Sequence, residues 1–276
     1  MFDQDAQPEL PRAKPVIGWP GGKTRMLKHI LHRIPEHTLY CEVFGGGLAV
    51  FLAHQPSEVE VINDINGELV SFYRCCKYHL EALLDDIDLV LNSRQELRDY
   101  LAQPGLTEIQ RAARWFIRNR ISFGGQGQNF AVCRTHALNS RAKNMLAIRS
   151  LNRRLDRTTI ENSTWEKCFS LYDSPESFFF LDPPYLDSGG SAYAGWSEHE
   201  LTRFATTVVK LKGSWMVTFQ DCPQIRAAFA GFQIIGIDRA NGIGNNGKNR
   251  AGRRYLEVII TNERDEFTAA RKARGA

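Results

Sequence analysis

The stretch FFFLDPPY, residues 178–185, decides both the fold and the candidate site. Its four apolar residues indicate a fully buried strand, which must end at Asp182 because proline cannot continue a central strand. Each proline fixes its own φ and restricts the residue before it, so the chain leaves the sheet in a stiff direction. The Asp182 carboxylate and the Pro183 carbonyl then stand as acceptors beside the Tyr185 ring. Such a corner suits a planar amine, although a plain strand-ending turn explains the same residues.

Alkylation of an exocyclic amine is chemistry that this corner could support. The lone pair of such a nitrogen is delocalised into its ring, so the nitrogen is a poor nucleophile until it is drawn toward tetrahedral geometry. Asp182 and the Pro183 carbonyl can each accept one N–H and aim the lone pair at an electrophile. Tyr185 can stack on the ring, a contact worth about 1–3 kcal/mol. Asp-Pro-Pro-Tyr after an apolar strand resembles the Dam-type (D12 class) DNA adenine-N6 methyltransferases, which implies S-adenosylmethionine as methyl donor, no metal, and Asp182, Pro183 and Tyr185 as catalytic residues.

Length and composition fit this resemblance without requiring it. A chain of 276 residues can form one large α/β domain with an insertion, or two modest domains. The net charge of +4 is mildly basic. Residues 1–7 carry two aspartates and no apolar run, and no stretch approaches a membrane span, so we expect a cytoplasmic protein. The six cysteines lack metal-site spacing and are predicted to be reduced core thiols. The resemblance implies a bacterial or phage-encoded protein, and we expect a monomer or weak dimer.

A glycine-rich turn near the N-terminus is the first candidate cofactor segment. Residues 15–23, PVIGWPGGK, form an apolar entry and a turn, and residues 26–34 follow with helical spacing. Backbone N–H groups at a helix start, with Lys23, can face an anionic group such as a carboxylate. A surface turn with a solvated lysine accounts for the same residues. Trp-x-Gly-Gly-Lys resembles the cofactor-contacting segment of Dam-type enzymes, which implies that Trp19 and Lys23 touch the cofactor.

A strand, a glycine turn and a helix follow, as in the first unit of a nucleotide-binding α/β sheet. Residues 39–44 indicate a strand, 45–47 are Gly-Gly-Gly, 48–53 are helix-like, and 59–64 indicate a second strand that ends in Asp64. An acid there suits ribose hydroxyls, or else caps a helix that starts near Gly67. The pattern resembles the family's Glu-x-Phe-x-Gly-x-Gly, with Leu48 at its last glycine. The implied cofactor-binding residues are Trp19, Lys23, Glu42, Phe44, Gly46, Asp64 and Asp182.

The segment 67–158 differs in composition from the rest of the chain. It begins with helical spacing over residues 69–84, and three aspartates at 85, 86 and 88 are expected to end that run. From Arg111 to Arg157 there are eleven Lys or Arg residues and one acid, Asp156. Arg111, Arg114 and Arg118 share one helical face. A basic run is usually a solvated face, but such runs mix signs and this one does not, which favours phosphate contacts.

A loop rich in amide side chains lies inside this basic segment. Residues 123–130, FGGQGQNF, carry Gln and Asn side chains, which can pair bidentately with adenine. A second basic connection, residues 239–254, has five Lys or Arg and no acid, and its part at 241–252 is expected to contact DNA as well. The predicted DNA-binding residues are Arg114, Arg118, Arg120, Gln126, Gln128, Asn129, Arg134, Lys248 and Arg250.

The remaining elements complete an α/β fold. Ser197 with Glu200 forms a capping box at a helix start, so His199 is expected to be exposed. Strands are predicted over 214–219, 232–238 and 255–260, the last two as a terminal antiparallel hairpin. We therefore predict a Rossmann-like methyltransferase sheet with a terminal antiparallel strand and a mainly helical inserted recognition domain. Its domains are 1–66 and 159–276, which form the catalytic part, and 67–158, the insertion.

The order of the segments is that of Dam-type methylases: cofactor turn, glycine strand, basic insertion, then Asp-Pro-Pro-Tyr. The resemblance implies an adenine-specific DNA methyltransferase that acts on a flipped base without a metal. Three alternatives stay open. Cytosine N4 methylation uses the same geometry, although Asp before Pro-Pro resembles the adenine enzymes. RNA is a possible substrate, and a DNA-binding regulator on an inactive methylase fold would need none of the chemistry.

Overall fold

The computed structural model describes residues 13–90, 92–132, 134, 140–186, 195–240 and 254–262, without the side chains at positions 239, 240, 254 and 255. The chain divides into two compact units. The first comprises Met1–Leu27, Gly47–Gln55 and Glu68–Thr159, and the second comprises Lys28–Gly46, Pro56–Gly67 and Ile160–Ala276.

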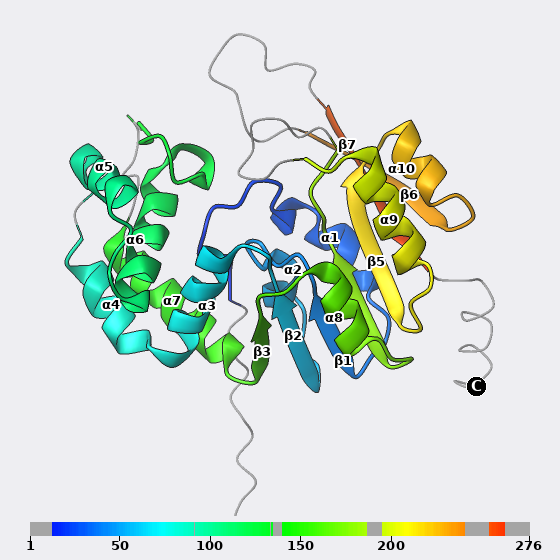
Figure 1. Cartoon of the computed structure of the whole chain (residues 1–276), viewed down its shortest axis with the longest axis horizontal. Coiled ribbons are helices and arrows are strands. Elements are labelled where there is room, and N and C mark those ends of the chain that lie inside the picture. The colour runs from blue at the N-terminus through cyan, green and yellow to red at the C-terminus, as the bar shows by residue number, and fades with distance from the viewer. Residues whose placement is uncertain are drawn as a thin grey trace, which may run out of the picture. The chain divides into compact units, whose positions relative to one another are not determined.

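The strands form one mixed sheet (Figure 1). Their order is β3-β2-β1-β4-β5-β7-β6. The pairs β1–β2, β1–β4 and β4–β5 are parallel, whereas β7 lies antiparallel between β5 and β6. This is the mixed sheet with a terminal antiparallel hairpin that the sequence predicted. The strands are β1 Leu39–Glu42, β2 Val59–Asn63, β3 Thr158–Glu161, β4 Ser177–Leu181, β5 Ser214–Gln220, β6 Gln233–Ala240 and β7 Arg254–Thr261.

The order of the strands reverses at β1. The chain passes from β1 to β2 on one side of it, and later returns to β4 on its other side. In open α/β sheets, ligands bind at the carboxyl ends of the strands beside such a reversal. The register Glu42↔Phe180 places the ends of β1 and β4 at the same level. The residues just after these two strands therefore stand next to each other at the sheet edge.

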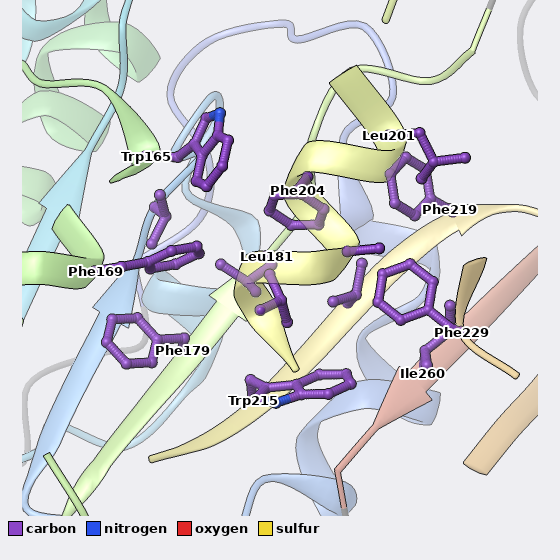
Figure 2. Packing of buried hydrophobic residues seen from close by; sticks show 14 of the residues in the cluster. Trp165, Phe169, Phe179, Leu181, Leu201, Phe204, Trp215, Phe219, Phe229 and Ile260 are labelled. Atoms are coloured by element: carbon purple, nitrogen blue, oxygen red, sulfur yellow. The ribbon is translucent and has the colours of Figure 1, made fainter. Parts of the chain in front are cut away.

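A large apolar cluster covers one face of the sheet in the second unit. Figure 1 shows α8 (Trp165–Tyr172) and α9 (Glu198–Val208) lying across this face, and α10 (Pro223–Ala228) contributes Ile225. Figure 2 shows Phe204 of α9 among Trp165, Phe169, Leu181 and Phe219. Its ring meets Trp165 edge-on at 5.5 Å between centroids. Successive strand residues point to opposite faces, so β4 sends Phe179 and Leu181 into this cluster.

The first unit is mainly helical in its described residues. The stacked rings of Phe72 and Phe116 are 5.2 Å apart and join α3 to α6. Side-chain caps at Ser93 and Thr107 start α5 and α6. The assignment of 67–158 as an inserted recognition domain stays a prediction. The helices are η1 Lys23–Arg25, α2 Ala49–Ala53, α3 Gly67–Tyr78, α4 Leu80–Asp88, α5 Arg94–Ala102, α6 Glu108–Ile121, η3 Phe123–Gly125 and α7 Arg141–Leu155; α1 Leu27–Ile30 spans the unit boundary and η2 Leu31–Arg33 lies in the second unit.

A helix cap, a helical stretch and the cysteines were also predicted from the sequence. The Ser197 hydroxyl accepts a hydrogen bond from the Glu200 N–H, so the predicted cap is confirmed, and His199 is exposed. The helical residues expected at 69–84 lie in α3 and α4, which are separated at His79, and α4 ends at Asp88, the last of the three aspartates. Five cysteines are free thiols, and Cys133 lies outside the described residues. No helix in the described part of the chain has the length and apolarity needed to cross a membrane.

Candidate active site

Three acids stand at one edge of the sheet in the second unit. Glu42 is the last residue of β1, Asp64 directly follows β2, and Asp182 directly follows β4. Because β2, β1 and β4 are adjacent and parallel, their carboxyl ends meet at the same edge. We call this edge, with the residues that follow each strand, the carboxyl edge. It lies beside the point where the strand order reverses, where a ligand is expected.

The corner at residues 182–185 is accessible and held from below. Asp182 and Tyr185 are partly exposed, whereas Pro183 is buried. The Thr218 hydroxyl of β5 donates a 2.8 Å hydrogen bond to Asp182 Oδ1. The Tyr185 hydroxyl donates a 3.0 Å bond to Glu257 Oε1 of β7. The two side chains predicted to handle an amine therefore have fixed orientations and remain within reach of a ligand.

Asp64 ties the end of β2 to the glycine turn. The Gly46 N–H donates to Asp64 Oδ2 at 2.9 Å, and the Asn66 N–H donates to Oδ1 at 2.9 Å. Gly46 has a φ of +46°, which glycine adopts readily. Since α3 begins at Gly67, the N-cap position is Asn66, and Asp64 is not the cap of that helix. Burial raises the pKa of the Asp64 carboxyl, and the backbone N–H groups of Asn66, Gly46 and Ile65 partly offset this.

Leu48 stands at the last glycine position of the pattern and adopts a strained, left-handed backbone conformation. It has φ +55° and ψ +34°, and in the described part of the chain it is the one non-glycine residue with a positive φ. This conformation costs an ordinary residue about 1–2 kcal/mol. The Leu48 side chain is buried, so its burial offsets that strain. The backbone therefore follows the left-handed path of a glycine even though the residue has changed.

Glu42 and Phe44 lie at the end of β1 with different surroundings. Glu42 is buried, and the buried Tyr40 hydroxyl donates to its Oε2 at 2.7 Å. Burial and the neighbouring Glu42 raise the pKa of Tyr40, so its phenol stays a donor. Phe44 is partly buried and packs edge-on against Trp196 and Phe204. Both residues are thus fixed at the carboxyl edge, as a binding role requires.

Trp19 and Lys23, the other predicted cofactor residues, belong to the first unit. Trp19 lies 6.5 Å from Trp115, measured between ring centroids. A Cβ added at Gly47 would be 3.2 Å from Trp19 Cβ, so close approach favours glycine there. Lys23 is buried, and its ammonium donates to the Gly21 carbonyl at 2.8 Å. This excludes the simple alternative of a solvated surface lysine.

The predicted arginine face of α6, Arg111, Arg114 and Arg118, is held by intramolecular contacts. Arg111 forms a 2.5 Å ion pair with Glu68. Arg114 donates to the Gln103 carbonyl at 2.8 Å, and Arg118 Nε donates to the Gly127 carbonyl at 3.3 Å. A carbonyl has no net charge, so the last two guanidinium groups keep charge for a phosphate. Burial lowers the pKa of Arg118, and Glu68 partly offsets this.

The amide-rich loop is closed by hydrogen bonds and presents its side chains outward. The Phe123 N–H donates to the Asn129 carbonyl at 2.7 Å, and the Gly127 N–H donates to the Ser122 hydroxyl at 2.6 Å. Gln126, Gln128, Asn129 and Arg134 are exposed. Arg120 is partly buried, and burial lowers its pKa. Lys248 and Arg250, and the basic connection at 241–252, lie outside the described residues.

Comparison with known proteins identifies the family. The D12 class N6 adenine-specific DNA methyltransferase family matches residues 19–243. The chain belongs to this family. A type II methyltransferase of Lactococcus lactis subsp. cremoris is 28% identical over 279 residues, which cover 90% of this chain and 95% of that protein. A DNA adenine methylase of Vibrio cholerae serotype O1 is 24% identical over 277 residues, which cover 91% and 96%. A type II methyltransferase of Paramecium bursaria Chlorella virus NC1A is 25% identical over 234 residues, which cover 79% and 87%.

Membership in the D12 class assigns methylation of adenine N6 in DNA and implies S-adenosylmethionine as co-substrate. The carboxyl edge fits such a molecule. Asp64 is a buried carboxylate that accepts the backbone N–H groups of Gly46, Ile65 and Asn66 and still has a lone pair for a ribose hydroxyl. Among the described residues, no group of three or more His, Cys, Asp or Glu side chains is placed to hold a metal ion.

Two residues that contact the corner at residues 182–185 were not predicted from the sequence. Thr218 and Glu257 lie within otherwise apolar strands, and each bonds to a residue that the sequence did identify. A polar residue inside a buried strand is the signal that could have found them, because it must meet a partner there. In the first unit, Asn119 was also missed. Its amide accepts from the Gly18 N–H and donates to the Gly18 and Gly125 carbonyls.

Proposed function

We propose that this D12 methyltransferase acts on an adenine flipped out of the DNA helix, with the corner at residues 182–185 as the site of methyl transfer. The observation that carries this proposal is the accessibility of Asp182 and Tyr185 at the carboxyl edge, combined with their buried hydrogen-bond partners. An enzyme that acts on a base amine must take the base out of the stack to reach it. A rigid, partly exposed pair of an acceptor and an aromatic ring suits a base delivered in this way.

In this mechanism the corner orients the amine. The Asp182 carboxylate and the Pro183 carbonyl each accept one N–H of N6, and Tyr185 stacks on the adenine ring. S-adenosylmethionine supplies an electrophilic methyl group on a sulfonium. N6 forms its bond to the methyl carbon as the carbon–sulfur bond breaks, the electron pair stays on sulfur, and N6 then releases one proton. Asp182 acts as a hydrogen-bond acceptor, because the amine becomes acidic only after methylation. Holding the reactants in this geometry provides much of the acceleration.

The co-substrate is proposed to lie along the carboxyl edge. Asp64 accepts from a ribose hydroxyl, and Glu42, Phe44 and Gly46 form the adjoining floor at the end of β1. Trp19 and Lys23 are proposed to contribute, as the family resemblance implies, and Asp182 serves both ligands. The buried position of Lys23 supports this proposal, since a buried ammonium group requires polar or charged partners.

DNA is proposed to contact the first unit. Arg114 and Arg118 supply charge to phosphates, because the hydrogen bonds described for them go to neutral carbonyls. Gln126, Gln128 and Asn129 are exposed on a closed loop and are proposed to read base edges. Arg120 and Arg134 are proposed to add positive charge for DNA. Lys248 and Arg250 stay a prediction from the sequence.

Transfer of a labelled methyl group to DNA tests this function, with digestion of the product to separate N6-methyladenine from N4-methylcytosine. We expect N6-methyladenine, and no detectable transfer by Asp182→Ala at an unchanged thermal unfolding temperature. Single-base sequencing of the product would then map the methylated adenine. Transfer to cytosine or to RNA would support the corresponding alternative. Appreciable turnover by the alanine variant would remove Asp182 from the mechanism, and DNA binding by a wild type that transfers nothing would indicate a regulator.

A further inference from the structure

Two polar side chains lie in the buried interior of the sheet directly below the corner. Thr218 of β5 and Glu257 of β7 have no exposed area. Antiparallel pairing places them close together, since Thr218 pairs with Ile259 and Gln220 pairs with Glu257. Their neighbours Phe219 and Val258 belong to the apolar cluster, so both polar residues point to the other face. Burial of a hydroxyl or carboxylate is unfavourable without a partner, and a sheet does not need either residue here.

The Thr218 hydroxyl fixes the orientation of the Asp182 carboxylate. It donates to Asp182 Oδ1 at 2.8 Å, and its contact with the Leu181 carbonyl is longer, at 3.5 Å. Asp182 follows the end of β4, where its side chain could otherwise rotate. A hydrogen bond from a buried donor cannot be exchanged for one from water. The plane of the carboxylate, and therefore the direction of its remaining lone pairs, is set by β5.

Glu257 fixes the far end of the Tyr185 ring and changes its electronic character. The Tyr185 hydroxyl donates to Glu257 Oε1 at 3.0 Å, while the ring packs 6.1 Å from Phe219. Gln220 donates to the Leu186 carbonyl at 3.1 Å and holds the chain that follows. A phenol that donates to a carboxylate has a more electron-rich ring, and an aromatic face attracts positive charge. N6 gains positive charge as the methyl group arrives.

We propose that Thr218 and Glu257 are positioning residues for methyl transfer, acting through Asp182 and Tyr185 respectively. This inference rests on the proposed function, in which Asp182 accepts from the amine and Tyr185 stacks on the base. Neither Thr218 nor Glu257 touches a substrate. Thr218 sets the direction of the carboxylate, and Glu257 places the ring and favours the charge that develops on N6. Both should therefore affect the chemical step more than substrate binding.

Thr218→Val removes the hydroxyl with little change in shape, and Thr218→Ser keeps it. We expect the valine variant to lower kcat about 10- to 100-fold, the range expected for loss of a hydrogen bond to a charged group, with KM for DNA and S-adenosylmethionine within about twofold. The serine variant should restore most of the rate. Thr261→Val is the matched control, because Thr261 is a buried β7 threonine whose hydroxyl bonds to Gln233. A valine variant as fast as wild type, or a serine variant as slow as the valine one, would overturn the role of Thr218.

Glu257→Gln keeps the size and one acceptor but removes the charge. We expect kcat to fall about five- to tenfold, and Tyr185→Phe to make the enzyme insensitive to this change, because Glu257 acts through the phenol. A second readout uses DNA with 2-aminopurine at the mapped adenine, whose fluorescence reports stacking of the flipped base. Its bound-state intensity should change in Glu257→Gln and not in Thr261→Val. Equal effects of Glu257→Gln in both tyrosine backgrounds, or unchanged fluorescence, would refute the role of Glu257.

These outcomes are separable from failure of the proposed function. If wild-type protein methylates DNA and Asp182→Ala does not, the function stands whatever the Thr218 and Glu257 variants do. Thermal unfolding of every variant, followed by circular dichroism, separates a lost fold from a lost rate. A variant that unfolds below the assay temperature is assayed beside wild type at a lower temperature at which it remains folded, and the ratio of the two rates then decides its role.

Discussion

The carboxyl edge of the second unit and the arginine face of α6 in the first both carry candidate functional residues, and both hold them with intramolecular partners. At the edge, Asp182 and Tyr185 bond to Thr218 and Glu257, which are fully buried. On α6, Arg111 pairs with Glu68, and the two side chains are 45% and 40% exposed. The contacts look alike when counted, but water reaches one set of partners and not the other.

This difference decides what an arriving ligand can change. An exposed ion pair contributes about 0.2–1 kcal/mol, so a phosphate can replace Glu68 as the partner of Arg111. A buried hydrogen bond to a charged group is harder to replace, because breaking it leaves a desolvated partner behind. The carboxyl edge is therefore expected to be preformed before substrates bind. The arginine face is expected to exchange its partners when DNA binds.

The largest effect is expected at the edge itself. Asp64→Asn keeps the size of the side chain, but it replaces one of the two oxygens that accept from the Gly46 and Asn66 N–H groups and removes the charge that a ribose hydroxyl would meet. A hydrogen bond to a charged group is worth about 1.5–3 kcal/mol, so the affinity for S-adenosylmethionine should fall about 10- to 100-fold. Titration calorimetry measures this directly. Asp85→Asn on exposed α4 is the control and should bind as wild type does; equal affinities of the Asp64 variant and wild type would place the ribose elsewhere.

Acid should weaken the same binding step in the wild type. The carboxylate accepts from hydroxyls and the protonated form does so less well, so affinity is lost as pH falls through the pKa of Asp64. Burial raises that pKa, and the loss should therefore begin at a higher pH than for an ordinary aspartate. Calorimetry across the acid range checks the prediction. The affinity of the Asp64→Asn variant should depend less on pH than that of the wild type. If both affinities change with pH in the same way, another group is responsible for the titration.

Much of the edge could be predicted from the sequence because local chemistry dictates it. Two prolines stop β4 at Asp182, a run of glycines makes the turn after β1, and an acid ends the second strand. Thr218 and Glu257 could not be assigned in that way. Their partners lie 36 and 72 residues away in sequence, and the pairing of β4 with β5 and of β5 with β7 brings them below the corner. Leu48 shows the reverse case, since the backbone path is kept there although the residue is not glycine.

The ion pairs of the segment 67–158 could not be predicted from the sequence for a related reason. Its basic run has one acid within it, so the sequence alone indicated uncompensated charge. The compensating acids come from the earlier helices α3 and α4. Glu68 lies 43 residues before Arg111, and Glu81 lies 68 residues before Arg149, which it binds through two hydrogen bonds. A count of charges along the chain cannot find partners that tertiary packing supplies. Arg114 and Arg118, whose described hydrogen bonds go to backbone carbonyls, are the residues of this face proposed to contact DNA.

The difference between arginines paired with acids and arginines bonded to carbonyls predicts an effect of intermediate size on DNA binding. In the double variant Arg114→Gln, Arg118→Gln, the slope of log DNA affinity against log salt concentration should become less steep by about two. Each phosphate contact contributes about 0.9 to this slope. Arg149→Gln is the matched control and should change the slope little, because this arginine of α7 is not among the residues proposed to contact DNA and is held by two hydrogen bonds to Glu81. Fluorescence anisotropy over a range of salt concentrations gives the slopes. A double variant with the wild-type slope would mark the face as merely solvated.

The smallest effect is expected for Glu68→Gln, and it tests whether phosphate replaces Glu68 as the partner of Arg111. Glu68→Gln removes the acid that pairs with Arg111 and also lies near Arg118, so both guanidinium groups should become more available to phosphate. Because the lost pair is exposed, the free energy of unfolding should fall by less than about 1 kcal/mol, as measured in urea. DNA affinity at low salt should rise, with a slope steeper by up to about one. If Arg111 instead needs Glu68 to hold it in a binding orientation, affinity will drop, and Arg111→Gln will then weaken binding by the same factor.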